Sequence, residues 1–168
     1  TIARKRGIYI ISNEEYLTSY QDSLIHIYER SVVVNSLSKI YGFPGLRIGW
    51  LATKNQLLRN NALNYKRFVT VSNSSLCSAL AVQVLQNRKI FEERYHRFCN
   101  DGMKIAQAML KDMAELELLP LSGVPYVYLG LNLDVSSYDF AKRLLRDYKT
   151  LIMPAEVFEG KQAIRVSI

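Results

Sequence analysis

The N-terminal part of the chain alternates short apolar runs with polar, turn-forming stretches. Continuous apolar runs predict strands at residues 7–12, 31–36 and 46–52. Strands without polar alternation are typical of a parallel sheet covered on both faces. Helical spacing over residues 54–69, with Leu57, Leu58, Ala62 and Tyr65 at core positions, and over about 76–86 completes an α/β pattern.

The C-terminal part of the chain shows a different pattern. A long helix is expected over about residues 90–116, followed by a strand at 126–133 whose alternation is typical of a half-solvated antiparallel sheet. The remaining expected elements are a helix over 137–148 with Ser137 as its N-cap and short strands at 150–153 and 163–167. We therefore predict two domains, residues 1–93 and 94–168, with the boundary inside the long helix.

Composition narrows the class of protein. Hydrophobic residues make up 49% of the 168 residues and charged residues 22%, which is typical of a globular protein. The basic residues behind the net charge of +7 are dispersed, so we expect no nucleic-acid partner. No apolar run approaches the roughly 20 residues that span a bilayer, and no signal peptide is recognisable. Cys77 and Cys99 have neither metal-ligand nor disulfide-framework spacing, so we expect a cytoplasmic protein without a metal site.

Side chains that could bind a ligand or take part in catalysis follow the second expected strand. Ser36 and Ser38 carry hydroxyls that can donate to phosphate oxygens, and Arg47 is a planar cation suited to phosphate. Lys39 lies between them, and a nearby cation together with a desolvating cofactor favours the neutral lysine amine, which attacks aldehydes. Since ligands bind at strand ends in open parallel sheets, this set suits a phosphate compound that carries an aldehyde.

A known family has the same run of residues. The segment resembles the cofactor-lysine signature of class I/II aminotransferases, the fold-type I enzymes that depend on pyridoxal phosphate (PLP), and it reads Ser36-Leu37-Ser38-Lys39-Ile40-Tyr41-Gly42-Phe43-Pro44-Gly45-Leu46-Arg47-Ile48-Gly49-Trp50. The resemblance implies that Lys39 binds PLP as a Schiff base and shuttles a proton. It also implies that Ser36, Ser38 and Arg47 hold the cofactor phosphate. The fold it implies is α/β: the C-terminal part of the PLP-binding large domain, mostly parallel sheet, in residues 1–93, and an α+β small domain in 94–168.

A second block supports the resemblance and also departs from it. Residues 10–16 resemble the family strand that ends in Ser-Asp-Glu-x-Tyr, which implies that Tyr16 bonds the phenolic oxygen of the cofactor. Asn13 stands where the family has an aspartate that pairs with the pyridine nitrogen. Because asparagine is neutral, it cannot form that ion pair, and the ring would be a weaker electron sink. Other PLP-dependent chemistry, such as that of a lyase, oxidase or hydroxylase, therefore stays open.

A third block lies at the end of the chain. Residues 163–168 resemble the family strand whose arginine binds the substrate α-carboxylate, which implies that role for Arg165. Residues 153–160 resemble a Pro-Gly-x-x-Phe-Gly turn in which Ala155 and Glu159 replace the glycines, so the two loops need not share one shape. Residues 123–128 resemble the small-domain segment of the family that lies near the substrate, but we assign the aromatic residues Tyr126 and Tyr128 to the core.

The leading hypothesis is a PLP-dependent aminotransferase that acts on an amino acid and a 2-oxo acid. The resemblance implies a homodimer, and it covers only the C-terminal half of the family's length. The chain opens with Thr1, and we expect it to begin inside a longer protein. We expect the isolated chain not to form a competent site, because the Gly-rich phosphate loop and the ring-stacking aromatic residue belong to the other half. A non-catalytic fragment remains an alternative.

Overall fold

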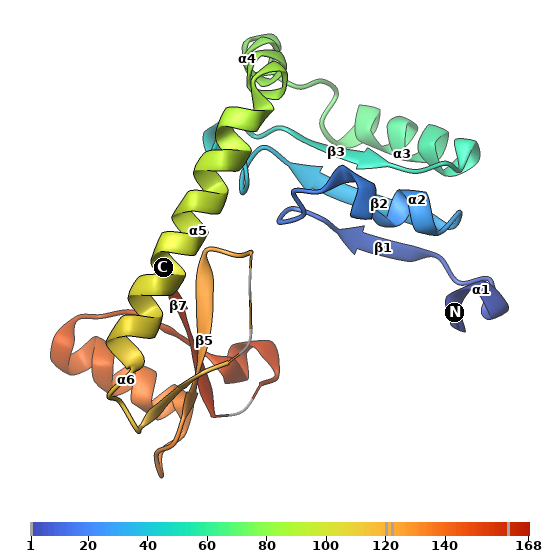
Figure 1. Ribbon diagram of the computed structural model, residues 1–168. Coiled ribbons are helices and arrows are strands. Elements are labelled where there is room, and N and C mark those ends of the chain that lie inside the picture. Colours follow the sequence, from blue (N-terminus) through green and yellow to red (C-terminus); the bar gives the residue numbers. More distant parts are fainter. Residues whose placement is uncertain (1, 120, 122, 161) are drawn as a thin grey trace. The chain divides into compact units, whose positions relative to one another are not determined.

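The computed structural model describes residues 2–119, 121, 123–160 and 162–168. The chain divides into two compact units, Thr1–Tyr95 and His96–Ile168. Helix α5, Arg88–Leu110, contains the division (Figure 1). The sequence placed a domain boundary in the same helix, between residues 93 and 94, and the assignment of these parts to a large and a small domain stays a prediction.

The first unit holds a three-stranded sheet in the order β1-β2-β3 (Figure 1). The strands are β1 (Ile10–Asn13), β2 (Ser31–Ser36) and β3 (Gly49–Ala52). β1 runs parallel to β2, but β3 is antiparallel to it, so this part of the expected mostly parallel sheet is mixed. The expected strand at 46–52 starts only at Gly49, because Pro44–Leu46 form a 3-10 turn, η2.

Short helices and capped helices connect and flank these strands. They are α1 (Ile2–Arg6), η1 (Tyr20–Asp22), α2 (Leu24–Ile27), α3 (Gln56–Val69) and α4 (Ser75–Gln86). Gly7 follows α1 with a φ of 63°, the left-handed conformation that commonly ends a helix. The Ser74 side chain accepts a hydrogen bond from the Cys77 N–H and caps α4.

The core of the first unit forms between the loop after β2 and helix α4. Leu37, Ala81 and Val84 are buried there. The partly buried side chains that pack on them are Tyr41, Phe43, Leu46, Ile48 and Phe91.

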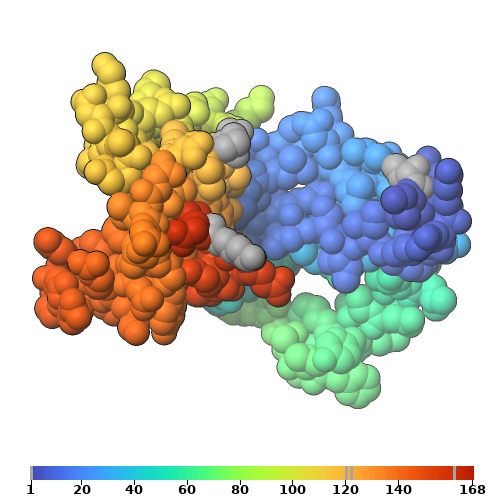
Figure 2. Space-filling model, turned by 90° about the horizontal axis from the view of Figure 1, so that it is seen from below, coloured from blue at the N-terminus to red at the C-terminus, as the bar shows by residue number. Residues whose placement is uncertain are grey.

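Helix α3 does not contribute a buried side chain to this core. The spacing of Leu57 and Tyr65 predicted core positions, and this prediction is wrong, because their side chains are 69% and 71% exposed. Figure 2 shows this helix, in green, at the surface of the first unit.

The second unit is an antiparallel sheet in the order β4-β5-β7-β6 with one long helix. Its elements after α5 are β4 (Leu116–Leu118), β5 (Tyr126–Leu131), α6 (Ser137–Tyr148), β6 (Met153–Pro154), η3 (Ala155–Phe158) and β7 (Ala163–Ser167). Its core consists of Val127, Leu129, Leu131 and Ile164. The α+β character expected of this part is therefore observed.

Two boundary predictions in the second unit are wrong. The long helix ends at Leu110 instead of 116, because residues 116–118 pair with β5 as a strand. The N-cap of α6 is Ser136, whose hydroxyl accepts from the Asp139 N–H at 3.0 Å. Ser137 is fully buried as the first helical residue. The sequence predicts a linker with a turn at residues 120–125, of which residues 120 and 122 lie outside the described residues.

None of the described helices is both long enough and apolar enough to cross a membrane.

Candidate active site

Buried leucine and isoleucine side chains anchor the loop that carries Lys39. Leu37 is 0% exposed and Ile40 is 2% exposed, whereas Lys39 between them is exposed. Burying each apolar side chain contributes about 1.5–3 kcal/mol to folding. Backbone bonds close the turn, because the Gly42 N–H donates to the Lys39 carbonyl at 3.1 Å and the Phe43 N–H donates to the Leu37 carbonyl at 2.8 Å. The core therefore fixes this loop and directs Lys39 to the surface of the unit.

The glycines of the signature differ in backbone conformation and in the space around them. Gly42 has a φ of 79°, and a Cβ there would lie 2.5 Å from Nη2 of Arg94. That same nitrogen donates to the Tyr41 carbonyl at 2.9 Å, so the space at Gly42 is already in use. A Cβ at Gly49 would lie 3.0 Å from the Asn35 carbonyl oxygen, whereas one at Gly45 would meet nothing within 4 Å.

Tyr41 is a titratable group of the same loop. Burial raises the pKa of its hydroxyl above the ordinary value, and the nearby Glu92 carboxylate adds to the shift. The phenol therefore stays neutral at neutral pH.

Arg47 ends the turn that precedes β3. Its φ of 53° is left-handed, and its Nη1 donates to the Pro44 carbonyl at 3.0 Å. The Leu37 N–H donates to the Ile48 carbonyl at 3.0 Å, which brings the backbone next to Arg47 beside the start of the lysine loop. Ser36 lies opposite Gly49 in the same ladder. The two segments that the sequence assigned to phosphate thus run side by side.

The end of β1 lies beside the end of β2. Because the strands are parallel, with Asn13 opposite Val34, their carboxyl ends meet at one edge of the sheet. Beyond this pair, the Glu14 N–H donates to the Val34 carbonyl at 2.9 Å, and Asn35 Nδ2 donates to the Glu14 carbonyl at 2.8 Å. The segment that leads to Tyr16 therefore adjoins the segment that leads to Lys39.

The side chain of Asn13 takes part in the turn after β1. Its Oδ1 accepts from the Glu15 N–H at 3.1 Å. Since a backbone N–H can only donate, the amide oxygen is the atom that faces it. The Asn13 Nδ2, which is a donor, is then the atom with which this exposed side chain can meet a ligand.

Glu14 and Glu15 lie at the same edge of the sheet. Glu14 is 8% exposed, and its Oε1 accepts from the Leu24 N–H at 2.9 Å, which caps the start of α2. Glu15 Oε1 accepts from the Ser36 hydroxyl at 2.5 Å. The only sequence signal for these contacts was an acidic pair directly after a strand.

These contacts bear on how well the edge fits PLP. Ser36 and Ser38 offer hydroxyls, Lys39 an amine and Arg47 a guanidinium, a donor set that fits a compound with a phosphate and an aldehyde. The contact between Ser36 and the Glu15 carboxylate opposes a phosphate, because both anions accept from the same hydroxyl. Among the residues described, no three His, Cys, Asp or Glu side chains are grouped as a metal site.

Arg165 lies in the second unit, in the middle of β7, and is half-buried. Its Cζ lies over the ring of Phe158 at 4.7 Å and over the ring of Tyr126 at 5.2 Å. Tyr126 and Tyr128 are only half-buried and alternate with buried residues along β5, so the prediction that they belong to the core is wrong. Their rings contact each other edge to face at 6.0 Å.

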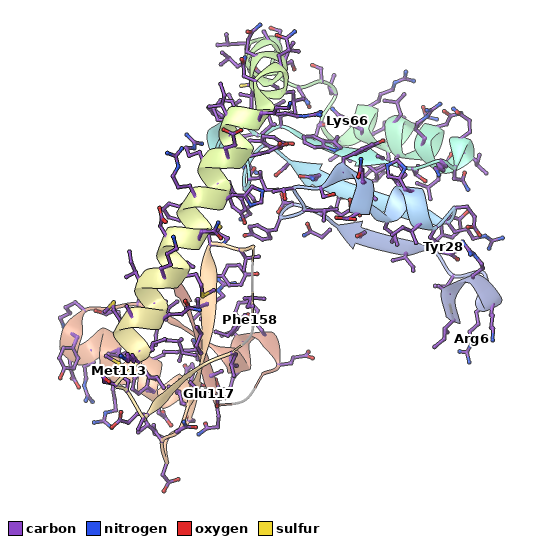
Figure 3. The ribbon with its side chains drawn as sticks, viewed as in Figure 1. Arg6, Tyr28, Lys66, Met113, Glu117 and Phe158 are labelled. Atoms are coloured by element: carbon purple, nitrogen blue, oxygen red, sulfur yellow. The ribbon has the colours of Figure 1, made fainter. Side chains whose placement is uncertain are left out.

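The loop before Arg165 is closed without the two glycines of the family turn. Ala155 is 3% exposed, and the Gly160 N–H donates to its carbonyl at 2.9 Å. Glu159 takes a left-handed φ of 59°, a conformation that glycine adopts without strain. Phe158, labelled in Figure 3, is the last residue of the 3-10 turn in this loop.

The sequence comparison agrees with the signature around Lys39. All of residues 1–168 match the sequence model of the family described as aminotransferase class I and II. The chain belongs to this family. The predicted family and the predicted α/β fold of the family's C-terminal part are thereby confirmed.

Individual aminotransferases show how far the similarity extends. Aspartate aminotransferase of Pyrococcus horikoshii is 23% identical over 99% of this chain and 45% of its own length. Histidinol-phosphate aminotransferase of Methanococcus aeolicus is 27% identical over 94% of this chain and 40% of its own length. The crystal structure of a PLP-dependent aminotransferase from Streptococcus suis superposes with a TM-score of 0.89 at 26% identity, over 99% of this chain and 45% of that one. The chain thus spans less than half the length of these relatives.

Proposed function

We propose that this chain supplies the lysine-bearing part of a PLP-dependent aminotransferase, which moves an amino group from an amino acid to a 2-oxo acid. The observation that carries the proposal is the shared edge of β1 and β2. There the Glu14 N–H donates to the Val34 carbonyl, and the loop of Lys39 follows β2 directly. Family membership supports the same reaction class. In this proposal residues 1–93 belong to the PLP-binding large domain and residues 94–168 form the small domain.

Each residue at the edge of the first unit has a proposed task. Bound PLP would supply an aldehyde and an electron-withdrawing ring. Lys39 provides the amine for the aldehyde and carries the proton during transfer. Ser36, Ser38 and Arg47 donate to the phosphate.

The remaining proposed contacts concern the cofactor ring and the substrate. The Tyr16 hydroxyl contacts the phenolic oxygen, and Asn13 faces the ring nitrogen. Because Asn13 Oδ1 accepts from Glu15, its Nδ2 would donate to that nitrogen in the unprotonated form. Arg165 binds the α-carboxylate of the amino acid or 2-oxo acid.

The proposed partners follow from the family resemblance and the composition. We propose a cytoplasmic homodimer with no metal, nucleic-acid or membrane partner. The dispersed basic residues support the absence of a nucleic-acid partner.

A chimaera tests the proposed function. In it, this chain replaces the matching C-terminal part of the Streptococcus suis aminotransferase, which supplies the rest of the fold. We expect PLP to give a visible absorption band and borohydride to fix the cofactor on the peptide that contains Lys39. Lys39→Ala should abolish both signals, whereas Lys54→Ala, at an exposed position, should leave both. Amino transfer that persists in the Lys39→Ala variant refutes the assignment.

Asn13 motivates a second candidate function, a PLP-dependent lyase, oxidase or hydroxylase reaction on the same fold. A neutral side chain at this position lowers the stability of a carbanion at the substrate. Product analysis distinguishes the candidates, because ammonia or peroxide without amino transfer supports the second one. In the chimaera, Asn13→Asp should increase transamination if the neutral residue limits it. A chimaera that binds no PLP supports a non-catalytic role instead.

A further inference from the structure

Two aromatic rings lie next to the guanidinium group of Arg165 in β7. The Arg165 Cζ lies 4.7 Å from the ring centre of Phe158 and 5.2 Å from that of Tyr126. The negative face of an aromatic ring attracts a guanidinium group placed over it. Arg165 is half-buried, so these contacts act with reduced competition from water.

Strand register places Tyr126 beside Arg165. Tyr128 lies directly opposite Arg165 in the antiparallel ladder, and Tyr126 lies opposite Ser167. Tyr126 is therefore the diagonal neighbour of Arg165 on the same face of the sheet. The opposite face of β5 carries the buried residues of the core, such as Val127.

The closed turn after β6 places the second ring. Met153 pairs with Arg165 across the ladder, and the chain then turns through Ala155–Phe158. The Glu159 N–H donates to the Glu156 carbonyl at 3.2 Å, which ends the turn directly after Phe158. Phe158 thus reaches Arg165 from the turn that follows β6, the strand paired with β7.

Ring contacts and hydrogen bonds use different parts of a guanidinium group. The Arg165 Cζ lies over both rings, whereas the N–H donors of a guanidinium group lie in its plane and point outward from its edge. Within the described part of the chain, no acceptor takes a hydrogen bond from Arg165. The arrangement restricts the side chain and leaves its donor edge available to a planar anion.

We propose that Tyr126 and Phe158 are positioning residues, which hold Arg165 in one orientation so that its donor edge meets the α-carboxylate of the substrate. This inference rests on the proposed role of Arg165 and extends it to two residues that contact the arginine instead of the substrate. Restricting a long side chain before binding reduces the entropy lost on binding. Replacing one ring by an aliphatic side chain should therefore weaken carboxylate binding about three- to tenfold.

The test uses the whole chain, labelled with ¹⁵N at its arginines, and pyruvate as the carboxylate probe. We expect the Nε–H resonance of Arg165 to be shifted by the ring currents and to move on titration with pyruvate. Phe158→Leu should remove much of the ring-current shift and raise the dissociation constant about three- to tenfold, whereas Phe158→Tyr should preserve both. Val157→Ala, in the same turn at a side chain that is 56% exposed, is the matched control.

Equal dissociation constants for the wild-type chain and Phe158→Leu overturn the proposal, and so does the lack of measurable binding by both. Backbone amide signals of β5 report whether each variant is folded. Should Phe158→Leu unfold the second unit, Tyr126→Leu provides the same comparison from the other ring. This measurement needs no PLP, whereas the proposed function is tested by cofactor fixation on Lys39, so the two hypotheses fail by different observations.

Discussion

Truncation of Leu37 should destabilise the first unit and release the loop that carries Lys39. The Leu37 side chain is 0% exposed and packs with Ala81 and Val84 of α4. Leu→Ala substitutions at fully buried sites cost about 2–5 kcal/mol, because transfer free energy is lost and a cavity remains. We expect about 3 kcal/mol for Leu37→Ala, because Ala81 and Val84 are held in α4 and backbone hydrogen bonds hold Leu37 to Ile48 and Phe43, so the cavity collapses poorly.

The assay is urea unfolding followed by tryptophan fluorescence. Trp50 is the single tryptophan of the chain, and it lies in β3 of the first unit. Its fluorescence therefore reports unfolding of this unit and not of the second. With a slope of about 2 kcal/mol per M urea, a loss of about 3 kcal/mol lowers the midpoint by about 1.5 M.

The control is Leu57→Ala on α3, which removes the same atoms at a side chain that is 69% exposed. We expect a change of at most about 0.5 kcal/mol there. Similar midpoints for the two variants would show that Leu37 does not anchor the lysine loop. A large loss for Leu57→Ala alone would mean that α3 is covered in solution by a contact outside the first unit.

Three further substitutions test the local geometry. Gly42→Ala should lower the free energy of unfolding in urea by about 1–2 kcal/mol, because the φ of Gly42 is 79° and therefore left-handed. Gly45→Ala has open space around the added Cβ and should change this free energy by at most about 0.5 kcal/mol. Equal effects of the two substitutions would contradict the prediction. Glu156 accepts from the Ser137 hydroxyl, which holds the pKa of the carboxyl below its ordinary value of 4.5. The stabilisation that the ionised Glu156 carboxylate provides is therefore present above about pH 4.5 and is lost as the pH falls through the lowered pKa. Between about pH 5 and pH 3, the melting temperature of Glu156→Gln should fall less than that of the wild-type chain. Parallel melting profiles of the two proteins would contradict this prediction. Glu159→Gly should stabilise the second unit by about 0.5 kcal/mol, measured by hydrogen exchange of the β5 amides. Relief of the left-handed backbone strain at residue 159 should exceed the conformational entropy that glycine adds to the unfolded chain. Faster exchange of the β5 amides in the variant would contradict this prediction.

Sequence periodicity found most elements, and it failed where tertiary contacts override local preference. The apolar run of β2 and the capped helix α4 were predicted with nearly correct ends, because their signals are local. The residues 116–118 continue an apolar helical pattern, yet they form β4, since pairing with β5 satisfies their backbone in the sheet. Likewise, nothing in the spacing of Leu57 and Tyr65 indicates that this face of α3 stays uncovered in the described chain.

Some features of the candidate site could also be predicted from the sequence, whereas others depend on tertiary contacts. The run of residues that contains Ser36, Lys39 and Arg47 indicated the family by resemblance, and its hydroxyls, amine and cation suit a phosphate compound that carries an aldehyde. Only the tertiary structure decided which neighbours these residues have. The Glu15 carboxylate meets Ser36 because two parallel strands end at the same edge.

The same contrast holds at Arg165. Its place in a strand near the end of the chain could be predicted from the sequence alone. The two rings that flank it come from β5 and from the turn after β6, and only the antiparallel pairing of the sheet brings them together. Sequence determines which groups are available, whereas contacts between residues distant along the chain exist only once the backbone hydrogen bonds of the sheet fix the register.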